Sequence, residues 1–165
     1  MKKYLTADAD STVWIVTLSL MACLLVLLIL AGGIPSMPGS AVAALYIAAG
    51  IIALVLLTGW LAKPIRYEVR DDSVSVVRSF PFSTVVIPKS EIKEARHVRL
   101  GSIRPTSVAV GWIFGYAGRF QSEELGPVVL LATNPANAVL VHADQKYVFT
   151  PANPKRFMND VLGRK

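Results

Sequence analysis

Residues 11–62 have the sequence STVWIVTLSLMACLLVLLILAGGIPSMPGSAVAALYIAAGIIALVLLTGWLA, which contains no Asp, Glu, Lys, Arg or His. An α-helix needs roughly 20 apolar residues, at about 1.5 Å each, to cross a hydrocarbon core of roughly 30 Å. The segment holds two such lengths, about residues 12–31 and 41–62, separated by GGIPSMPGS at residues 32–40. Because Pro lacks a backbone donor and Gly costs backbone entropy, this linker should form a short outer loop. The sequence therefore predicts a transmembrane helical hairpin.

The flanks of the hairpin predict its orientation. Trp14 and Trp60 lie near the outer limits of the pair, where an amphipathic ring favours the headgroup boundary. Basic residues, which stay preferentially in the cytoplasm, flank both spans, whereas the linker has none. We therefore expect a multi-pass inner-membrane (plasma-membrane) protein with residues 1–10 as a cytoplasmic N-terminal tail and both termini in the cytoplasm.

A secretory signal peptide is the competing interpretation of the first span. Lys2 and Lys3 precede it, and small residues follow at 31–33. However, the apolar stretch exceeds the roughly 7 to 15 residues of a typical signal-peptide core, and no Ala-x-Ala closes it. Its removal would also leave the second span unexplained, so we expect both spans to be retained.

The composition changes abruptly after Ala62, where charged residues return. The charges of the two lysines at the N-terminus are balanced by Asp8 and Asp10, so the whole formal net charge of +6 lies in residues 63–165. This length suffices for one small domain with one core. The excess of basic residues fits a soluble domain kept away from neutrality, or attraction to an anionic membrane surface. Residues 63–165 are predicted to form one cytoplasmic domain.

Period-two alternation of apolar residues predicts that this domain is mainly β. It begins in IRYEVR at residues 65–70, and a turn at Asp71 and Asp72 leads into SVSVVR at residues 73–78, so these strands should form a hairpin. Residues 79–82 contain a proline and should form the next turn. Further strands are predicted at residues 84–87, 119–121, 128–132, 139–142 and 147–150. Residues 89–99 support helix and strand equally.

One short helix is predicted at the C-terminus. Asn153 can cap it, Pro154 is tolerated at its first position, and Gly163 can end it. Phe157 and Val161 are four residues apart, which makes one face apolar. The helix should therefore pack on the sheet.

This order of elements resembles the bacterial pleckstrin-homology-like (PH-like) domains, which are often tethered behind membrane spans. The resemblance covers about residues 65–162; its best-matched parts are residues 118–120 with 126–141, YVFTP at 147–151 and NPKRF at 153–157. It implies a strongly bent antiparallel sheet, closed at one end by the terminal helix, and it does not imply an enzyme. In eukaryotic relatives of the fold a basic strand-loop-strand site can hold an inositol phosphate. The corresponding residues 66–84 lack a Lys/Arg cluster, so that site is not carried over.

A basic stretch in the domain is the first candidate contact site. Its bases are interrupted by Glu91 and Glu94. They could attract anionic lipid headgroups, at about 1 kcal/mol per base near the surface, or form a solvated face paired with the local acids. The candidate residues are Lys89, Lys93, Arg96, Arg99 and Arg104.

An aromatic segment is the second candidate contact site. Residues 108–118, VAVGWIFGYAG, interleave Trp112, Phe114 and Tyr116 with glycines inside a long connection. Exposed rings would suit a membrane interface or a protein partner, whereas buried rings would plug the open end of the sheet. We expect burial.

Catalytic chemistry finds little support in the sequence. Cys23, the only cysteine, lies in the middle of the first span, where lipid disfavours a reactive thiolate. His97 and His142 have no Cys or His at a metal-ligand spacing. Glu123 and Glu124, as neighbours on a strand, would face opposite ways. We therefore predict no catalytic residue, cofactor or metal site.

Together these features favour a non-enzymatic, membrane-anchored PH-like binding or scaffolding module. Its partners would be the lipid bilayer and a membrane protein or a second copy of the chain, because anchoring makes weak contacts effective. The pI of about 9.7 does not indicate nucleic-acid binding, since the bases are scattered and no binding motif accompanies them. One alternative is a sensor of anionic lipid headgroups, whose membrane affinity should fall as salt rises. Another is an accessory subunit of a membrane transporter or envelope enzyme.

Overall fold

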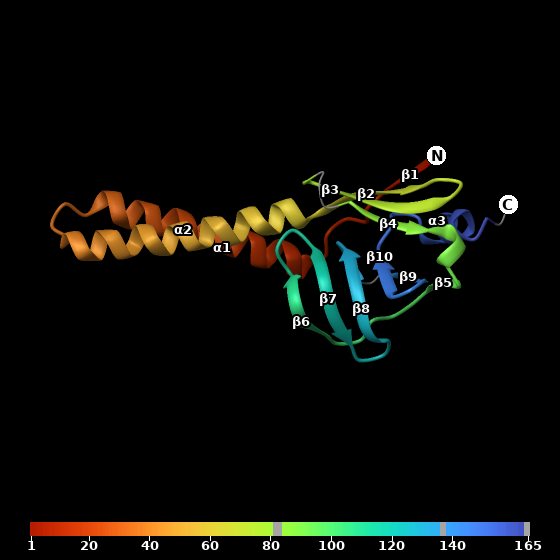
Figure 1. Ribbon diagram of the computed structural model, residues 1–165. Helices are drawn as coiled ribbons and strands as arrows, with labels where there is room; N and C mark the ends of the chain where they lie inside the picture. The colour runs from red at the N-terminus through yellow and green to blue at the C-terminus, as the bar shows by residue number, and fades with distance from the viewer. Residues whose placement is uncertain (81–83, 136–137, 164–165) are drawn as a thin grey trace.

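A long helical hairpin projects from one end of a mainly β domain (Figure 1). The computed structural model describes residues 1–80, 84–135 and 138–163, of which 107 and 108 are described by their backbone alone. Helices α1 (Ser11–Gly33) and α2 (Gly39–Ala62) lie side by side and are long and apolar enough to span a membrane. Only 11% of the most apolar stretch of α1 and 6% of that of α2 is buried. The side chains of both helices therefore face outward, unlike those of a core helix. The helices extend the predicted spans by at most two residues.

In the described part of the chain, the strands of the domain form two sheets. The first has the order β1-β2-β3-β4 and is antiparallel throughout. Its strands are β1 (Lys2–Leu5), β2 (Pro64–Val69), β3 (Ser73–Arg78) and β4 (Val85–Pro88). The edge strand β1 precedes the hairpin, whereas the other three follow it. Residues 1–10, predicted as a tail, therefore contribute a strand to the domain.

The second sheet has the order β5-β9-β10-β8-β7-β6. Its strands are β5 (Glu94–His97), β6 (Ile103–Val110), β7 (Tyr116–Ser122), β8 (Gly126–Ala132), β9 (Val139–His142) and β10 (Lys146–Phe149). The resemblance implies antiparallel pairing, and the described neighbours follow it apart from β8 and β10, which are parallel. Strand β10 forms an antiparallel pair with β9 and lies between β9 and β8, where it runs in the same direction as β8.

The first core lies between the two sheets and is closed by helix α3 (Pro154–Val161). Tyr67, Phe149 and Phe157 are fully buried there, with ring centroids 5.3–5.9 Å apart. The side chain of Asn153 accepts a hydrogen bond from the Arg156 N–H at 3.1 Å and caps the helix. The predicted C-terminal helix is confirmed, including its cap and its buried apolar face.

The second core lies on the other face of the second sheet. Phe120, Leu130 and Val148 pack there with Leu100 from the connection between β5 and β6. Val13 from the first turns of α1 joins the same cluster and is 2% exposed. The hairpin is therefore not an appended anchor, because its base is part of a hydrophobic core of the domain.

The predicted strands agree with the observed ones to within a few residues, and two strands have no counterpart in the prediction. These are β1 and β6, the latter in a region expected to be a long connection. The ambiguous residues 89–99 divide into a 3-10 turn, η2 (Lys89–Glu91), and strand β5. Of the predicted turn at 79–82, residues 81 and 82 lie outside the described part of the chain.

Candidate functional site at the hairpin–domain joint

The connection between β6 and β7 lies against the base of the hairpin (Figure 1). The backbone N–H of Phe114 donates to Thr17 Oγ1 of α1 at 3.2 Å. The Tyr116 hydroxyl donates to Asp10 Oδ2 at 3.3 Å, while Asp10 Oδ1 caps α1 by accepting from the Val13 N–H at 2.8 Å. We call these residues, together with Gly59 and Ile113, the joint.

Helix α2 meets the same connection through Gly59. A Cβ built on this buried glycine would lie 2.6 Å from Ile113 Cγ2 and 3.3 Å from the Ile113 carbonyl oxygen. Real Cβ atoms essentially never approach another heavy atom at the shorter of these distances. The close approach of α2 and the connection therefore requires glycine at position 59.

The backbone of the connection has unusual conformations. Trp112 and Phe114 have φ of 65° and 56°, in the left-handed region that bulky residues avoid. Conformations of this kind cost on the order of 1–3 kcal/mol each and persist only where the surroundings hold them. Here the hydrogen bond to Thr17 and the edge-on packing of Trp112 on Tyr116, with centroids 6.1 Å apart, hold the turn.

The sequence favours burial of the three aromatic residues, but in the structure only one of them is buried. Tyr116 is 3% exposed, whereas Trp112 and Phe114 are half-buried. They lie at the base of the two helices instead of plugging the open end of a sheet. Burial and the neighbouring Asp10 carboxylate raise the pKa of Tyr116 above its usual range, so its hydroxyl stays a neutral donor.

The N-terminal segment, residues 1–10, forms a second attachment between the hairpin and the domain. Strand β1 pairs with β2 from Lys2 opposite Val69 to Leu5 opposite Arg66. Next along the chain, the Ala7 N–H donates to the Thr150 carbonyl at 2.7 Å.

At the far end of β1, two side chains reach the C-terminal helix. The Tyr4 hydroxyl donates to Asp160, and Lys2 Nζ pairs with the same carboxylate at 2.7 Å. Burial, with the hydrogen bond to Asp160, raises the pKa of Tyr4 to about 12. Residues 1–10 are thus held along their length and do not form a free tail.

The basic stretch does not gather into one patch. Strands β5 and β6 are the outer strands of the second sheet, so Arg96 and Arg104 lie at opposite edges of it. Arg96 pairs with Glu94 at 2.8 Å, as the solvated-face interpretation expects, and Lys89 Nζ donates to the Asp160 carbonyl at 2.9 Å. Lys93, Arg99 and Arg104 are exposed. Figure 1 shows β6 beside the hairpin and β5 at the end of the domain farthest from it.

A hollow that the sequence does not predict opens on the second sheet. It has a volume of about 450 Å³, and its lining includes Arg119, His142, Asp144 and Lys146. Lys146 Nζ also donates to the Leu125 carbonyl at 2.6 Å. These side chains come from three strands and one turn, so no local pattern brings them together. Among the described residues, no group of three or more His, Cys, Asp or Glu could hold a metal ion.

Glu68 gives the domain a testable pH dependence. Its side chain is 7% exposed and accepts from Arg66 Nε at 2.9 Å and from Arg70 at 3.5 Å. The hydrogen bond from Arg66 holds the pKa of this carboxyl below its usual value, against the opposing effect of burial. A lowered folded-state pKa stabilises the fold above the unfolded-state pKa of about 4.3, and the stabilisation is lost as pH falls through the folded-state pKa.

We expect Glu68→Gln to lower the Tm of the full chain at neutral pH and to flatten its decline in acid. Thermal unfolding followed by circular dichroism between about pH 3 and pH 7 measures both effects. Glu94→Gln is the matched control, because Glu94 and Arg96 form an exposed pair that should contribute little. An equal pH response of wild type and Glu68→Gln would contradict this assignment.

Comparison with known proteins agrees with the geometry. The family model described as bacterial PH domain matches residues 65–165, which extend from β2 through α3. No curated protein and no solved structure matches the chain. The matched residues form more than half of the chain and fold as a mainly β region with a C-terminal helix, to which β1 adds a strand from outside the match. The chain therefore belongs to the bacterial PH domain family.

Proposed function

We propose that this protein is a non-enzymatic binding or scaffolding module whose hairpin holds the PH domain at the membrane surface in one orientation. The observation that supports this most is the attachment of the domain to both helices. Strand β1 leads into α1, only Lys63 separates α2 from β2, and the joint contacts both helices. A domain on a single flexible linker would rotate freely, whereas this one is constrained at each helix.

We further propose that the domain faces the cytoplasm. Because β1 and β2 are neighbours in one sheet, the two flanks of the hairpin lie on one side of any membrane it spans. Lys2, Lys3 and Lys63 are on those flanks, and basic residues favour the cytoplasmic side of an inner membrane.

The hollow of the second sheet supports a role in binding a protein partner. Among the described residues that line it, the cations Arg119 and Lys146 stand against one carboxylate, that of Asp144, which favours an acidic segment of a partner. Anchoring both molecules in one membrane raises their effective concentration, so a weak contact suffices. Strand β5, which carries Arg96, lies at the end of the domain farthest from the hairpin, and this favours contact with a protein there over contact with the bilayer.

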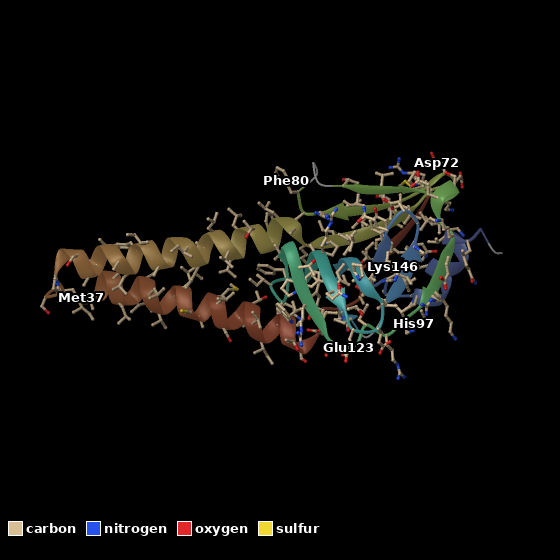
Figure 2. The ribbon with its side chains drawn as sticks, turned by 60° about the horizontal axis from the view of Figure 1, so that its bottom comes forward. Met37, Asp72, Phe80, His97, Glu123 and Lys146 are labelled. Carbon is tan, nitrogen blue, oxygen red and sulfur yellow. The ribbon has the colours of Figure 1, made fainter. Side chains whose placement is uncertain are left out.

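Distance measurements test the fixed orientation. Spin labels on cysteines at Met37, in the hairpin loop, and at His97, in β5, would report on the two ends of the molecule in a Cys23→Ser background (Figure 2). We expect one narrow distance distribution for the full chain in lipid nanodiscs. A broad or multimodal distribution would show a swivelling domain and overturn the fixed orientation.

Photo-crosslinking in cells tests the binding role separately. A photoreactive residue at Arg119 should give a discrete crosslinked product with a membrane-fraction protein, and the same probe combined with Lys146→Glu should give less of it. The same probe at Lys155, exposed on α3, is the control. No discrete product from position 119 would argue against this hollow as the partner surface.

A further inference from the structure

A separate hollow of about 340 Å³ opens at the foot of α2. Trp60 and Lys63 come from the end of the helix, Thr6 from the segment after β1, Ile65 from β2, and Ser79 follows β3 directly. Backbone hydrogen bonds hold this corner together, because the Ser79 N–H donates to the Lys63 carbonyl at 3.1 Å. The hollow is therefore built by three segments of the chain, around residues 6, 60–65 and 79, that meet in the folded domain.

The polar groups around this hollow suit an oxyanion. Lys63 Nζ and Ser79 Oγ have no hydrogen-bond partner among the described residues, and no carboxylate lines the hollow. The Thr6 hydroxyl makes only a long contact of 3.4 Å with the Ile65 carbonyl. An ammonium and two hydroxyls can all donate to one phosphate group.

A further cation lies next to the hollow. Arg78 precedes Ser79 and faces the other side of β3, where its Nε is buried without a partner among the described residues. Although Arg78 does not line the hollow, its charge adds to the positive potential that an anion meets there.

The position of the hollow indicates which anion it would meet. Trp60 is 51% exposed in the last turn of α2, and Trp14 is 57% exposed in the first turns of α1, at the same end of the hairpin. Exposed Trp at the end of an apolar span marks the headgroup level of a bilayer. Figure 2 shows Phe80, the residue after Ser79, beside this end of α2. The hollow thus lies where lipid phosphates are found.

We propose that this hollow binds the phosphate group of a membrane phospholipid. Lys63 pairs with the phosphate, Ser79 and Thr6 donate hydrogen bonds to its oxygens, and the Trp60 ring packs against the glycerol and the upper acyl chain. The site is distinct from the partner surface of the second sheet and does not depend on it. Its occupant would be a tightly held lipid beside the hairpin, unlike the exchanging lipids around the rest of the spans.

Native mass spectrometry of the full chain in detergent tests the proposal with phosphatidylglycerol as the probe. We expect one retained lipid per chain, with Lys63→Ala and Ser79→Ala each weakening its apparent affinity about tenfold, the loss expected of one charge-assisted hydrogen bond. Lys93→Ala, which removes an exposed base directly before β5, the strand farthest from the hairpin, should leave the affinity unchanged. Equal retention by all variants would overturn the site.

Two further probes distinguish the sources of binding. Diacylglycerol, which lacks the phosphate, should bind far more weakly than phosphatidylglycerol, and equal binding would show that only the acyl chains are held. Inorganic phosphate should not displace the lipid at millimolar concentration, and displacement would show a site for free phosphate instead. Unchanged thermal unfolding of Ser79→Ala would confirm that its loss of lipid is not a loss of fold.

Discussion

Replacing Phe157 with Ala should lower the free energy of unfolding of the domain by about 3–5 kcal/mol, the range for a fully buried Phe. Its side chain is 0% exposed on α3, and its ring packs with Tyr4, Tyr67 and Phe149 at centroid distances of 5.4, 5.8 and 5.9 Å. Truncation would leave a cavity where α3, the first sheet and the second sheet meet. Because Tyr4 is one of the lining residues, the docking of β1 should weaken as well.

Chemical denaturation of the full chain in detergent micelles, followed by near-ultraviolet circular dichroism, measures this loss. Phe80→Ala is the matched control, because Phe80 is 43% exposed beyond the end of β3. Its truncation should change the free energy of unfolding by less than about 1 kcal/mol. Similar losses for the two variants would contradict the placement of the core.

Replacing Gly59 with Leu should separate the domain from the base of α2. Leu is a better helix former than Gly and suits a lipid-facing span, so the helix itself should persist. At this position, however, the new side chain would occupy space filled by Ile113, whose Cγ2 lies 2.6 Å from the point where a Cβ on residue 59 would stand. Overpacking of this kind costs about 1–3 kcal/mol, enough to displace a connection whose backbone is already strained.

The distance between spin labels at positions 37 and 97 measures the separation. We expect a clearly broader distribution for Gly59→Leu than for the parent chain. Gly50→Leu is the control, because it makes the same change in the same helix at a place with nothing within 4 Å. Equal broadening by both substitutions would indicate that a Leu anywhere in α2 disturbs the helix. Broadening by neither would show that Gly59 does not determine how the domain is attached.

The sequence predicts the spans and most strands because their signals are local. A charge-free run of sufficient length identifies each span, and alternation identifies strands such as β2 and β3, whose apolar residues face one core. Strand β1 has a single buried residue, Tyr4, and its partner follows more than fifty residues later, so it carries no local signal. Strand β6 contains Pro105 and a register shift before Ala109, and it forms through its pairing with β7.

The candidate sites, too, are predicted from the sequence only where their signals are local. The aromatic segment is conspicuous in the sequence. However, Thr17 and Gly59, which contact this segment in the structure, are ordinary residues of an apolar span. Conversely, the basic stretch is contiguous in the sequence, yet Arg96 and Arg104 lie on the two opposite outer strands of a six-stranded sheet. Proximity along the chain predicts a shared surface only within one element, and both sites depend on contacts between elements.

The pairing of β1 with β2 has a consequence for how the protein is made. Lys2–Leu5 leaves the ribosome before either helix, and its partner Pro64–Val69 emerges only after both helices have been synthesised. If one helix failed to cross the bilayer, the two strands would end on opposite sides of it and could never meet. The first sheet would then lack its edge strand, and Asp160 would lose Lys2 and Tyr4. In a chain that spans a membrane, pairing of β1 with β2 therefore requires that both helices cross it.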